Sequence, residues 1–237
     1  MPLFDKFATT YDEGHTKAVA ITGFKPSYFH EYKVREVARY LAAKGLLDRS
    51  RTMLNYGCGT GNSEPYIERE MPDMTVCGVD VSPESIKVAR EANKQLGKVS
   101  FECIDGTTLP AGKSFDIAFI ANVFHHVHRE QHVTILRAIH AALNPGGLVF
   151  MFEFNLLNPF TVLMAILNDY RVDKDARMLM PWYTRRIYRE AGLEPVETRY
   201  TVFFPGFFKA LLPLERHLAW LPLGAHYCSI ARKPGKM

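Results

Sequence analysis

The stretch that decides the fold is Asn55-Tyr56-Gly57-Cys58-Gly59-Thr60-Gly61, which joins a short apolar run to a helix-forming segment. Glycine has no Cβ, so a turn of this composition lets backbone N–H groups come close to a bound ligand. The spacing argues against two common loops. Asn62 stands where a dinucleotide fingerprint has its third glycine, and the Gly-Lys-Ser/Thr ending of a P-loop is absent. Alone, the pattern predicts only a turn that can admit a ligand.

Short apolar runs alternate with helix-forming segments on both sides of this loop. The patterns predict strands at residues 52–56, 75–79, 98–104, 115–121 and 147–154. They predict helices at residues 25–47, 62–70, 83–96 and 129–143. After a stretch of broken periodicity, a helix at 184–191 and strands at 195–204 and 225–232 follow. This alternation is typical of an α/β fold with a mostly parallel sheet and helices on both faces.

The composition is that of one globular domain. The chain has 237 residues, of which 47% are hydrophobic and 23% charged, and its net charge of +4 comes from scattered basic residues. We therefore expect no nucleic-acid partner. The N-terminal stretch lacks the pattern of a signal peptide, and no apolar run reaches the ~18 residues that a membrane span needs. We expect a cytoplasmic protein without a membrane span.

No metal site is expected from the cysteines and histidines. The four cysteines stand far apart in the sequence, and three of them fall in predicted strands, so we expect free buried thiols. Adjacent histidines point apart, which disfavours the only conceivable zinc set, that of His125, His126, His128 and His132.

Two carboxylates follow the strands next to the glycine loop. Asp80 ends the second predicted strand, where a carboxylate can accept hydrogen bonds from a ribose diol. Asp105 ends the third predicted strand, where a side-chain oxygen can receive an adenine amine. Either residue alone is more often a helix cap or a turn residue. Their order along the chain, after a loop of this spacing, favours a nucleoside-containing ligand.

Five segments resemble the successive motifs of the class I, S-adenosylmethionine-dependent methyltransferases: residues 57–61, 78–82, 105–106, 115–118 and 143–147. The resemblance covers residues 4–154. It implies a Rossmann-like sheet of seven strands, mostly parallel, with the last strand antiparallel. It also implies a single domain with an N-terminal helical cap (1–47), a cofactor-binding core (48–154), and an acceptor-binding region (155–237) that holds an insertion and the last two strands.

The resemblance implies S-adenosylmethionine as the cofactor and S-adenosylhomocysteine as the product. It assigns cofactor contacts to Tyr11, Asn55, Gly57, Cys58, Gly59, Asp80, Val81, Asp105, Gly106 and Asn122. One position departs from the family, which usually has an acid where this chain has Asn55. An amide still accepts hydrogen bonds but loses the charge-assisted part of the interaction. Either cofactor binding is weakened or another acid compensates.

The candidate catalytic side chains follow the fourth and fifth predicted strands. A base is needed only when the methyl acceptor is a hydroxyl or a carbon acid, and histidine is suited to that task. In the sugar and natural-product O-methyltransferases that the chain resembles, a histidine and an acid from these two positions face the acceptor. We expect His125 as the base, with His126 beside it and Glu153 orienting it. Alternatively, the histidine pair is structural, and Glu153 caps its strand or pairs with Arg171 or Lys174.

We expect the acceptor to be a small molecule, methylated on a hydroxyl and bound by the C-terminal region. The residues assigned to it are Tyr28, Tyr32, Asn155, Arg171 and Tyr183. Many large apolar side chains there fit a pocket for a lipophilic acceptor, a peripheral membrane contact or a homodimer face, and core packing is the usual role of any single one. We expect a monomer or a homodimer. Three alternatives stay open: N-methylation, C-methylation, and cofactor binding without catalysis. A nicotinamide oxidoreductase and a nucleic-acid methyltransferase are disfavoured by the motifs.

Overall fold

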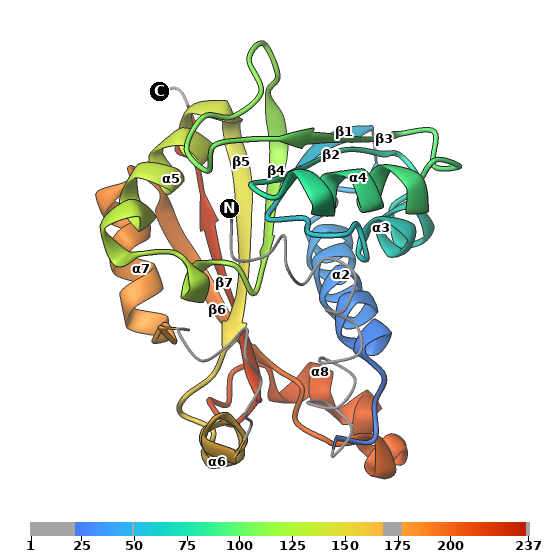
Figure 1. Ribbon diagram of the computed structural model, residues 1–237. Coiled ribbons are helices and arrows are strands. Elements are labelled where there is room, and N and C mark those ends of the chain that lie inside the picture. The colour runs from blue at the N-terminus through green and yellow to red at the C-terminus, as the bar shows by residue number, and fades with distance from the viewer. Residues whose placement is uncertain (1–21, 49, 168–176, 236–237) are drawn as a thin grey trace.

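The computed structural model describes residues 22–48, 50–167 and 177–235, which form one seven-stranded sheet with helices on both faces (Figure 1). The strands are β1 (Arg51–Tyr56), β2 (Met74–Asp80), β3 (Val99–Cys103), β4 (Phe115–Ala121), β5 (Leu143–Phe154), β6 (Glu194–Thr201) and β7 (His226–Arg232). Their order is β3-β2-β1-β4-β5-β7-β6. Only β7 runs opposite to the other six strands, and it pairs antiparallel with both β5 and β6, which confirms the predicted fold class.

The helices are α2 (Pro26–Ala43), α3 (Glu64–Glu70), α4 (Pro83–Ala92), α5 (Arg129–Ala142), α6 (Pro159–Leu167), α7 (Pro181–Glu190) and α8 (Glu215–Leu218), with 3₁₀ turns η3 (Phe124–His126) and η4 (Gly206–Leu214). Apolar residues of α2 and α3 pack on one face of the sheet, and those of α5 and α7 pack on the other. These two layers bury both faces of the inner strands, as the apolar runs in the sequence predict.

The predicted elements match the observed ones to within a few residues, with three informative differences. The helix after the glycine loop begins at Glu64, two residues later than predicted. The next helix stops at Ala92, because the side chain of Asn93 donates to the carbonyls of Ala89 and Gly61. The third strand ends at Cys103, so Asp105 lies in the following loop and not at the strand end. Cys103 is also exposed, unlike the other three cysteines, which corrects the expectation of buried thiols.

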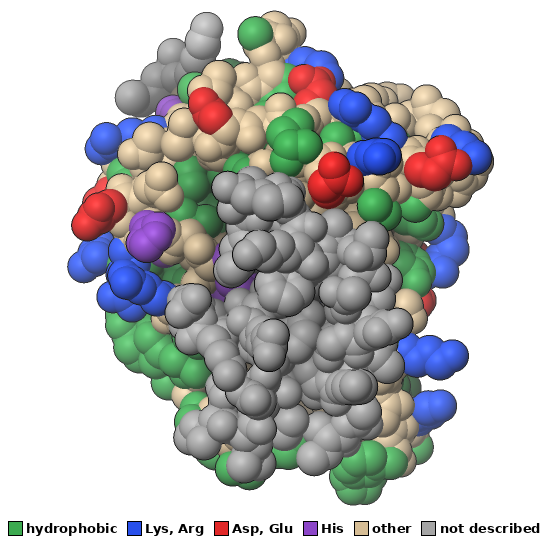
Figure 2. Space-filling model, in the orientation of Figure 1, with side chains coloured by type: hydrophobic (Ala, Val, Ile, Leu, Met, Phe, Trp, Pro, Cys, Tyr) green, Lys and Arg blue, Asp and Glu red, His purple; other side chains and the backbone are tan. Residues whose placement is uncertain are grey.

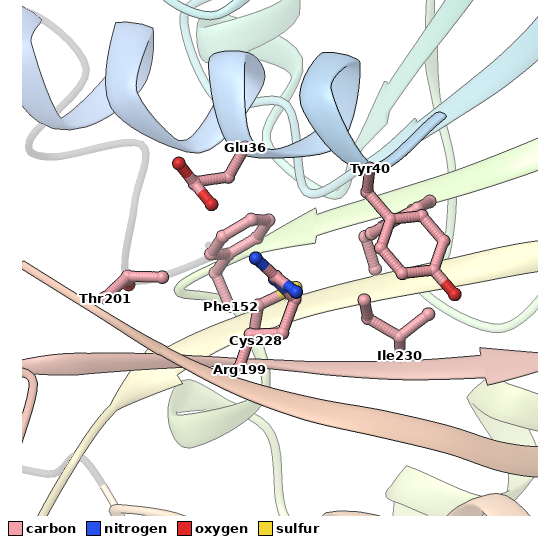
Figure 3. A pocket seen from close by; sticks show the side chains of 8 residues that line it. Glu36, Tyr40, Phe152, Arg199, Thr201, Cys228 and Ile230 are labelled. Atoms are coloured by element: carbon pink, nitrogen blue, oxygen red, sulfur yellow. The ribbon is translucent and has the colours of Figure 1, made fainter. Parts of the chain in front are cut away.

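The packing of α2 on the sheet leaves a hollow of about 10 Å³ near Glu36 and Arg199 (Figure 3). Such a volume is no larger than one water molecule requires. We therefore assign it to imperfect packing and look for the functional site elsewhere.

Candidate functional site

A cavity of about 310 Å³ opens at the carboxyl ends of β1, β2 and β4. The strand order reverses between β1 and β4, and sheets of this kind bind ligands at that reversal. Its wall includes eight of the ten residues predicted for the cofactor, namely Gly57, Cys58, Gly59, Asp80, Val81, Asp105, Gly106 and Asn122. Asn55 is buried behind the wall, and Tyr11 lies outside the described residues.

The glycine loop has backbone angles that only glycine adopts without strain. Gly57, Gly59 and Gly61 have φ values of +73°, +55° and +77°. A Cβ on Gly57 would collide with the side chain of Val123, whereas a Cβ on Gly59 would meet no described atom within 4 Å. Gly57 therefore allows the close packing of two loops, and Gly59 leaves the cavity open beside the backbone.

The carboxylate of Asp80 is held in place by the backbone of two loops. Its Oδ2 accepts the N–H of Gly59 at 2.9 Å, and its Oδ1 accepts the N–H of Ser82 at 2.9 Å. A carboxylate oxygen can accept more than one hydrogen bond. Because Asp80 also lines the cavity, it fits the predicted contact with a ribose diol.

Asp105 has the turn role that its sequence context left open. Its Oδ1 accepts the backbone N–H groups of Thr108 and Thr107 at 2.7 and 2.8 Å. These bonds to Thr108 and Thr107 lower the pKa of Asp105 to about 2. The loop that these hydrogen bonds fix includes Gly106, whose carbonyl accepts a hydrogen bond from the hydroxyl of Tyr56. Tyr56, Asp105 and Gly106 all line the cavity. The side chain of Asp105 therefore orders the wall in which the adenine contact is predicted.

Asn122 lines the cavity and has a buried acceptor atom. Its φ of +58° lies in the left-handed region, which asparagine tolerates better than most residues, and its N–H donates to the carbonyl of Phe152. Its Oδ1 is buried and has no hydrogen-bond partner among the described residues. A buried acceptor without a partner is costly unless a ligand supplies a donor or a positive charge. Together with Gly59 and Asp80, it makes the cavity fit S-adenosylmethionine.

The structure brings His125 and Glu153 together. His125 in η3 has Nδ1 2.6 Å from Oε2 of Glu153, and Oε1 of Glu153 accepts the N–H of Phe124 at 3.0 Å. The exposed fractions are 1% and 0%. A carboxylate that is ionised only accepts hydrogen bonds, so this contact places a proton on Nδ1 of His125. Neither side chain lines the cavity, although the neighbouring His126 does.

The other histidines of this loop differ in their surroundings. Burial, and then the charge of His125, lowers the pKa of His126 to about 3, so the ring is neutral at pH 7. His132 is tied down at both nitrogens: Nδ1 contacts the hydroxyl of Tyr183, and Nε2 contacts the carbonyls of Phe124 and Val127, all at 3.0 Å. Within residues 22–48, 50–167 and 177–235, no cluster of His, Cys, Asp or Glu could hold a metal ion.

None of the described residues predicted to contact the acceptor lines the cavity. Tyr32 donates to Glu215 of α8 at 2.8 Å, and Asn155 donates to the carbonyls of Pro222 and Gly224. Tyr28 stacks on Phe24, and Tyr183 pairs with His132. Tyr32 and Asn155 therefore hold C-terminal segments in place, and the predicted role of all four side chains as acceptor contacts gains no support. Arg171 lies outside the described residues, as does Lys174.

The prediction missed a buried acid next to Asn55. The Nδ2 of Asn55 donates to Oε1 of Glu64 at 2.7 Å, and Glu64, the first residue of α3, is fully buried. Burial raises the pKa of Glu64 to about 7, although Asn55 and the backbone N–H groups of Glu64 and Ser63 act in the opposite direction. The only signal in the sequence was an acid in the helix-start pattern that follows the glycine loop.

Comparison with known proteins agrees with this geometry. A family model described as a methyltransferase domain matches residues 53–147. The chain is 31% identical over 137 residues to trans-aconitate 2-methyltransferase of Methylobacterium radiotolerans, and 32% identical over 171 residues to the ubiquinone biosynthesis O-methyltransferase of Ruegeria pomeroyi. These alignments take in 57% and 65% of this chain and span 50% and 64% of the relatives, less than two thirds of either length.

A solved structure shares the fold along almost the whole chain. Magnesium protoporphyrin IX methyltransferase from Synechocystis, with bound S-adenosylhomocysteine, superposes with a TM-score of 0.66 at 17% identity and 97% coverage of both chains. The family model identifies residues 53–147 as a methyltransferase domain, and the sheet order and the loop at its reversal point agree with the class I, S-adenosylmethionine-dependent type.

Proposed function

We propose that the chain transfers a methyl group to a hydroxyl of an apolar small molecule, with His125 as general base and Glu153 as the residue that orients it. The observation that carries the proposal is the buried contact of 2.6 Å between His125 Nδ1 and Glu153 Oε2. Bound S-adenosylmethionine supplies an electrophilic methyl group on its sulfonium. The protein's remaining tasks are to bind, to align and to accept a proton.

The cavity wall supports the predicted cofactor contacts. Asp80 would accept the ribose hydroxyls, and Gly57 and Gly59 would lie along the methionine portion. Val81 is 38% exposed on the cavity wall, where an apolar side chain can cover the adenine ring. Asn122 would lie near the sulfonium, since its Oδ1 is the buried acceptor at that end of β4.

The contact with Glu153 suits His125 to accept a proton. Holding Nδ1–H against a carboxylate fixes the ring orientation and leaves Nε2 as the basic nitrogen. When the ring gains a second proton, the buried carboxylate stabilises the imidazolium, the same division of labour as in a Ser-His-Asp triad. A carboxylate acceptor would need no such base, so this pair favours a hydroxyl over the acid named in the trans-aconitate relative.

The acceptor class is inferred from an apolar end of the molecule. Nine of the twelve large hydrophobic side chains that are exposed in the described residues gather there, at 37% to 73% exposure: Leu157, Phe160, Leu163, Phe207, Phe208, Leu211, Leu214, Trp220 and Leu223. Hydrogen bonds from Asn155, Asn158 and Thr161 to carbonyls of residues 222–225 hold the two segments together. Hydrophobic side chains are visible at the lower end of Figure 2, where Figure 1 places α6 and α8.

The charges at this apolar end favour contact with an anionic membrane surface. In residues 156–163 and 203–223 the only acid is Glu215, which is buried and accepts the N–H groups of Phe203 and Phe204. The exposed side chains include Lys209 and Arg216. A surface that combines exposed aromatic and aliphatic groups with cations suits the interface of a bilayer. We propose that the region 155–237 takes a lipophilic acceptor from there. No described helix is long and apolar enough to cross a membrane.

The experiment offers the protein S-adenosylmethionine with phenols that carry short or long apolar tails, and with trans-aconitate, and measures S-adenosylhomocysteine. Turnover should be confined to tailed phenols. His125→Ala should then lower kcat by about 10²–10⁴-fold without changing the Kd for the cofactor. Glu153→Gln should also lower kcat and leave that Kd unchanged. His140→Ala, on the far part of α5, is the matched control. Full turnover in both variants refutes the base assignment, and methylation of trans-aconitate alone refutes the acceptor class.

A further inference from the structure

We infer that Glu64 carries the negative charge that this class usually places at position 55, so that the acid has moved from the end of β1 to the start of α3. The inference rests on the cofactor class and does not depend on which acceptor is methylated. Glu64 does not line the cavity, so we assign it as a positioning residue that acts through the glycine loop and through its charge.

The first support is the geometry of the pair. Asn55 and Glu64 are 3% and 0% exposed, and the single bond of 2.7 Å between them uses only Oε1 of the carboxylate. The second oxygen, Oε2, is buried and makes no hydrogen bond of normal geometry with any described residue. The pair therefore places a buried acid in direct contact with the side chain at position 55. The acid belongs to residue 64 and the amide to residue 55.

The second support is that Asn55 and Glu64 lie at the two ends of the glycine loop. Residues 57–61 lie between Asn55 and the helix of Glu64, and residues 57–60 form part of the cavity wall. Burial raises the pKa of the Cys58 thiol, and the charges of Glu64 and Asp80 raise it further. Cys58 lines the cavity, so the field of Glu64 reaches the wall against which the methionine portion is predicted to lie.

The third support is that Glu64 has no compensating cation in the part of the chain that the structure describes. No described Lys, Arg or His forms an ion pair with Glu64. A buried carboxylate in this state is costly, and a positive charge nearby relieves the cost. S-adenosylmethionine brings two such charges, an ammonium and a sulfonium. A buried acid that has no counterion within residues 22–48, 50–167 and 177–235 fits a role in recognising a cationic ligand.

The test compares Glu64→Gln, the double variant Asn55→Asp/Glu64→Gln, and Glu68→Gln as a matched control one turn further along α3. Calorimetry gives the Kd for S-adenosylmethionine and for adenosine, which lacks both positive charges. We expect Glu64→Gln to weaken S-adenosylmethionine binding about tenfold or more and adenosine binding less than about twofold. The double variant, with its acid back on β1, should recover to within about threefold of wild type.

The results separate this inference from the assignments above. If wild type binds S-adenosylmethionine and Glu64→Gln binds it equally well, the inference is wrong and the cofactor class stands. If both charged and uncharged ligands weaken together, Glu64 only supports the loop and its charge has no role. Should Glu64→Gln not fold, the double variant decides alone: a folded double variant that binds about tenfold more weakly than wild type overturns the proposal.

Discussion

The buried carboxylate of Glu64 should make the stability of the free protein depend on pH in a way that one substitution removes. Its pKa is about 7 in the folded chain against an ordinary value of 4.5, so the native state holds this proton more tightly than the unfolded state. Native protein is then favoured at low pH, and the contribution of Glu64 becomes unfavourable as pH rises from 4.5 to 7. Full ionisation corresponds to about 3 kcal/mol, at about 1.4 kcal/mol per pH unit.

Glu64→Gln removes the titration and adds an amide N–H, whose cost does not depend on pH. The difference in unfolding free energy between variant and wild type cancels that constant when it is followed with pH. Between about pH 5 and about pH 8 the difference should shift by about 2.5 kcal/mol in favour of the variant. Urea unfolding of both proteins without cofactor measures it, with Glu68→Gln as control. A difference that stays flat over this range refutes the reasoning, because the carboxylate would then titrate alike in both states.

Three further predictions concern the glycine loop, the exposed apolar surface and the buried His126. Gly57→Ala should weaken S-adenosylmethionine binding by at least about 100-fold in calorimetry, because its Cβ would strike Val123 and its φ of +73° disfavours alanine. Phe207→Ser and Trp220→Ser should each lower co-sedimentation with vesicles of about one third anionic lipid, whereas Trp182→Ser, an exposed tryptophan on α7, should not; equal losses in all three would contradict a localised membrane surface. The imidazole NMR signals of His126 should not titrate between about pH 5 and 8, since burial holds its pKa at about 3; a midpoint within that range contradicts the burial argument.

The sequence predicted the sheet well because its strands are buried on both faces. Such strands are continuous apolar runs, and the runs at β4 and β5 have almost no exposed position. The glycine loop could also be predicted from the sequence, because its positive φ angles favour glycine over other residues. Strand ends were less certain: Asp105 falls in a loop that its own hydrogen bonds create. A turn formed by the hydrogen bonds of one side chain has no hydrophobic periodicity, so the sequence pattern does not show where the strand ends.

The acceptor residues were harder to predict, because a polar or aromatic side chain does not reveal its partner. Tyr32 was expected to meet a substrate, yet its partner is Glu215, 183 residues further along the chain. Asn155 is used in the same way, to hold the turn at residues 222–224. Both contacts are long-range and internal, so no local pattern separates them from binding residues. The roles of His125 and Glu153 stay predictions, although the structure places the two side chains in contact.

Asn55 and Glu64 illustrate why one departure from a family motif is weak ground for assigning lost function. Read alone, Asn55 argues for a weakened or inactive cofactor site. In the fold, an acid nine residues later reaches the same buried place and bonds to that asparagine. Its charge is unfavourable in the free protein, because burial raises its pKa, and a cation bound nearby offsets part of that cost. The stability lost by the free protein and the affinity gained for a cationic ligand would then have one cause. As pH rises from about 5 to about 8, Glu64→Gln should therefore gain stability relative to wild type while its affinity for S-adenosylmethionine falls further behind that of wild type, a correlation that a purely structural glutamate would not produce.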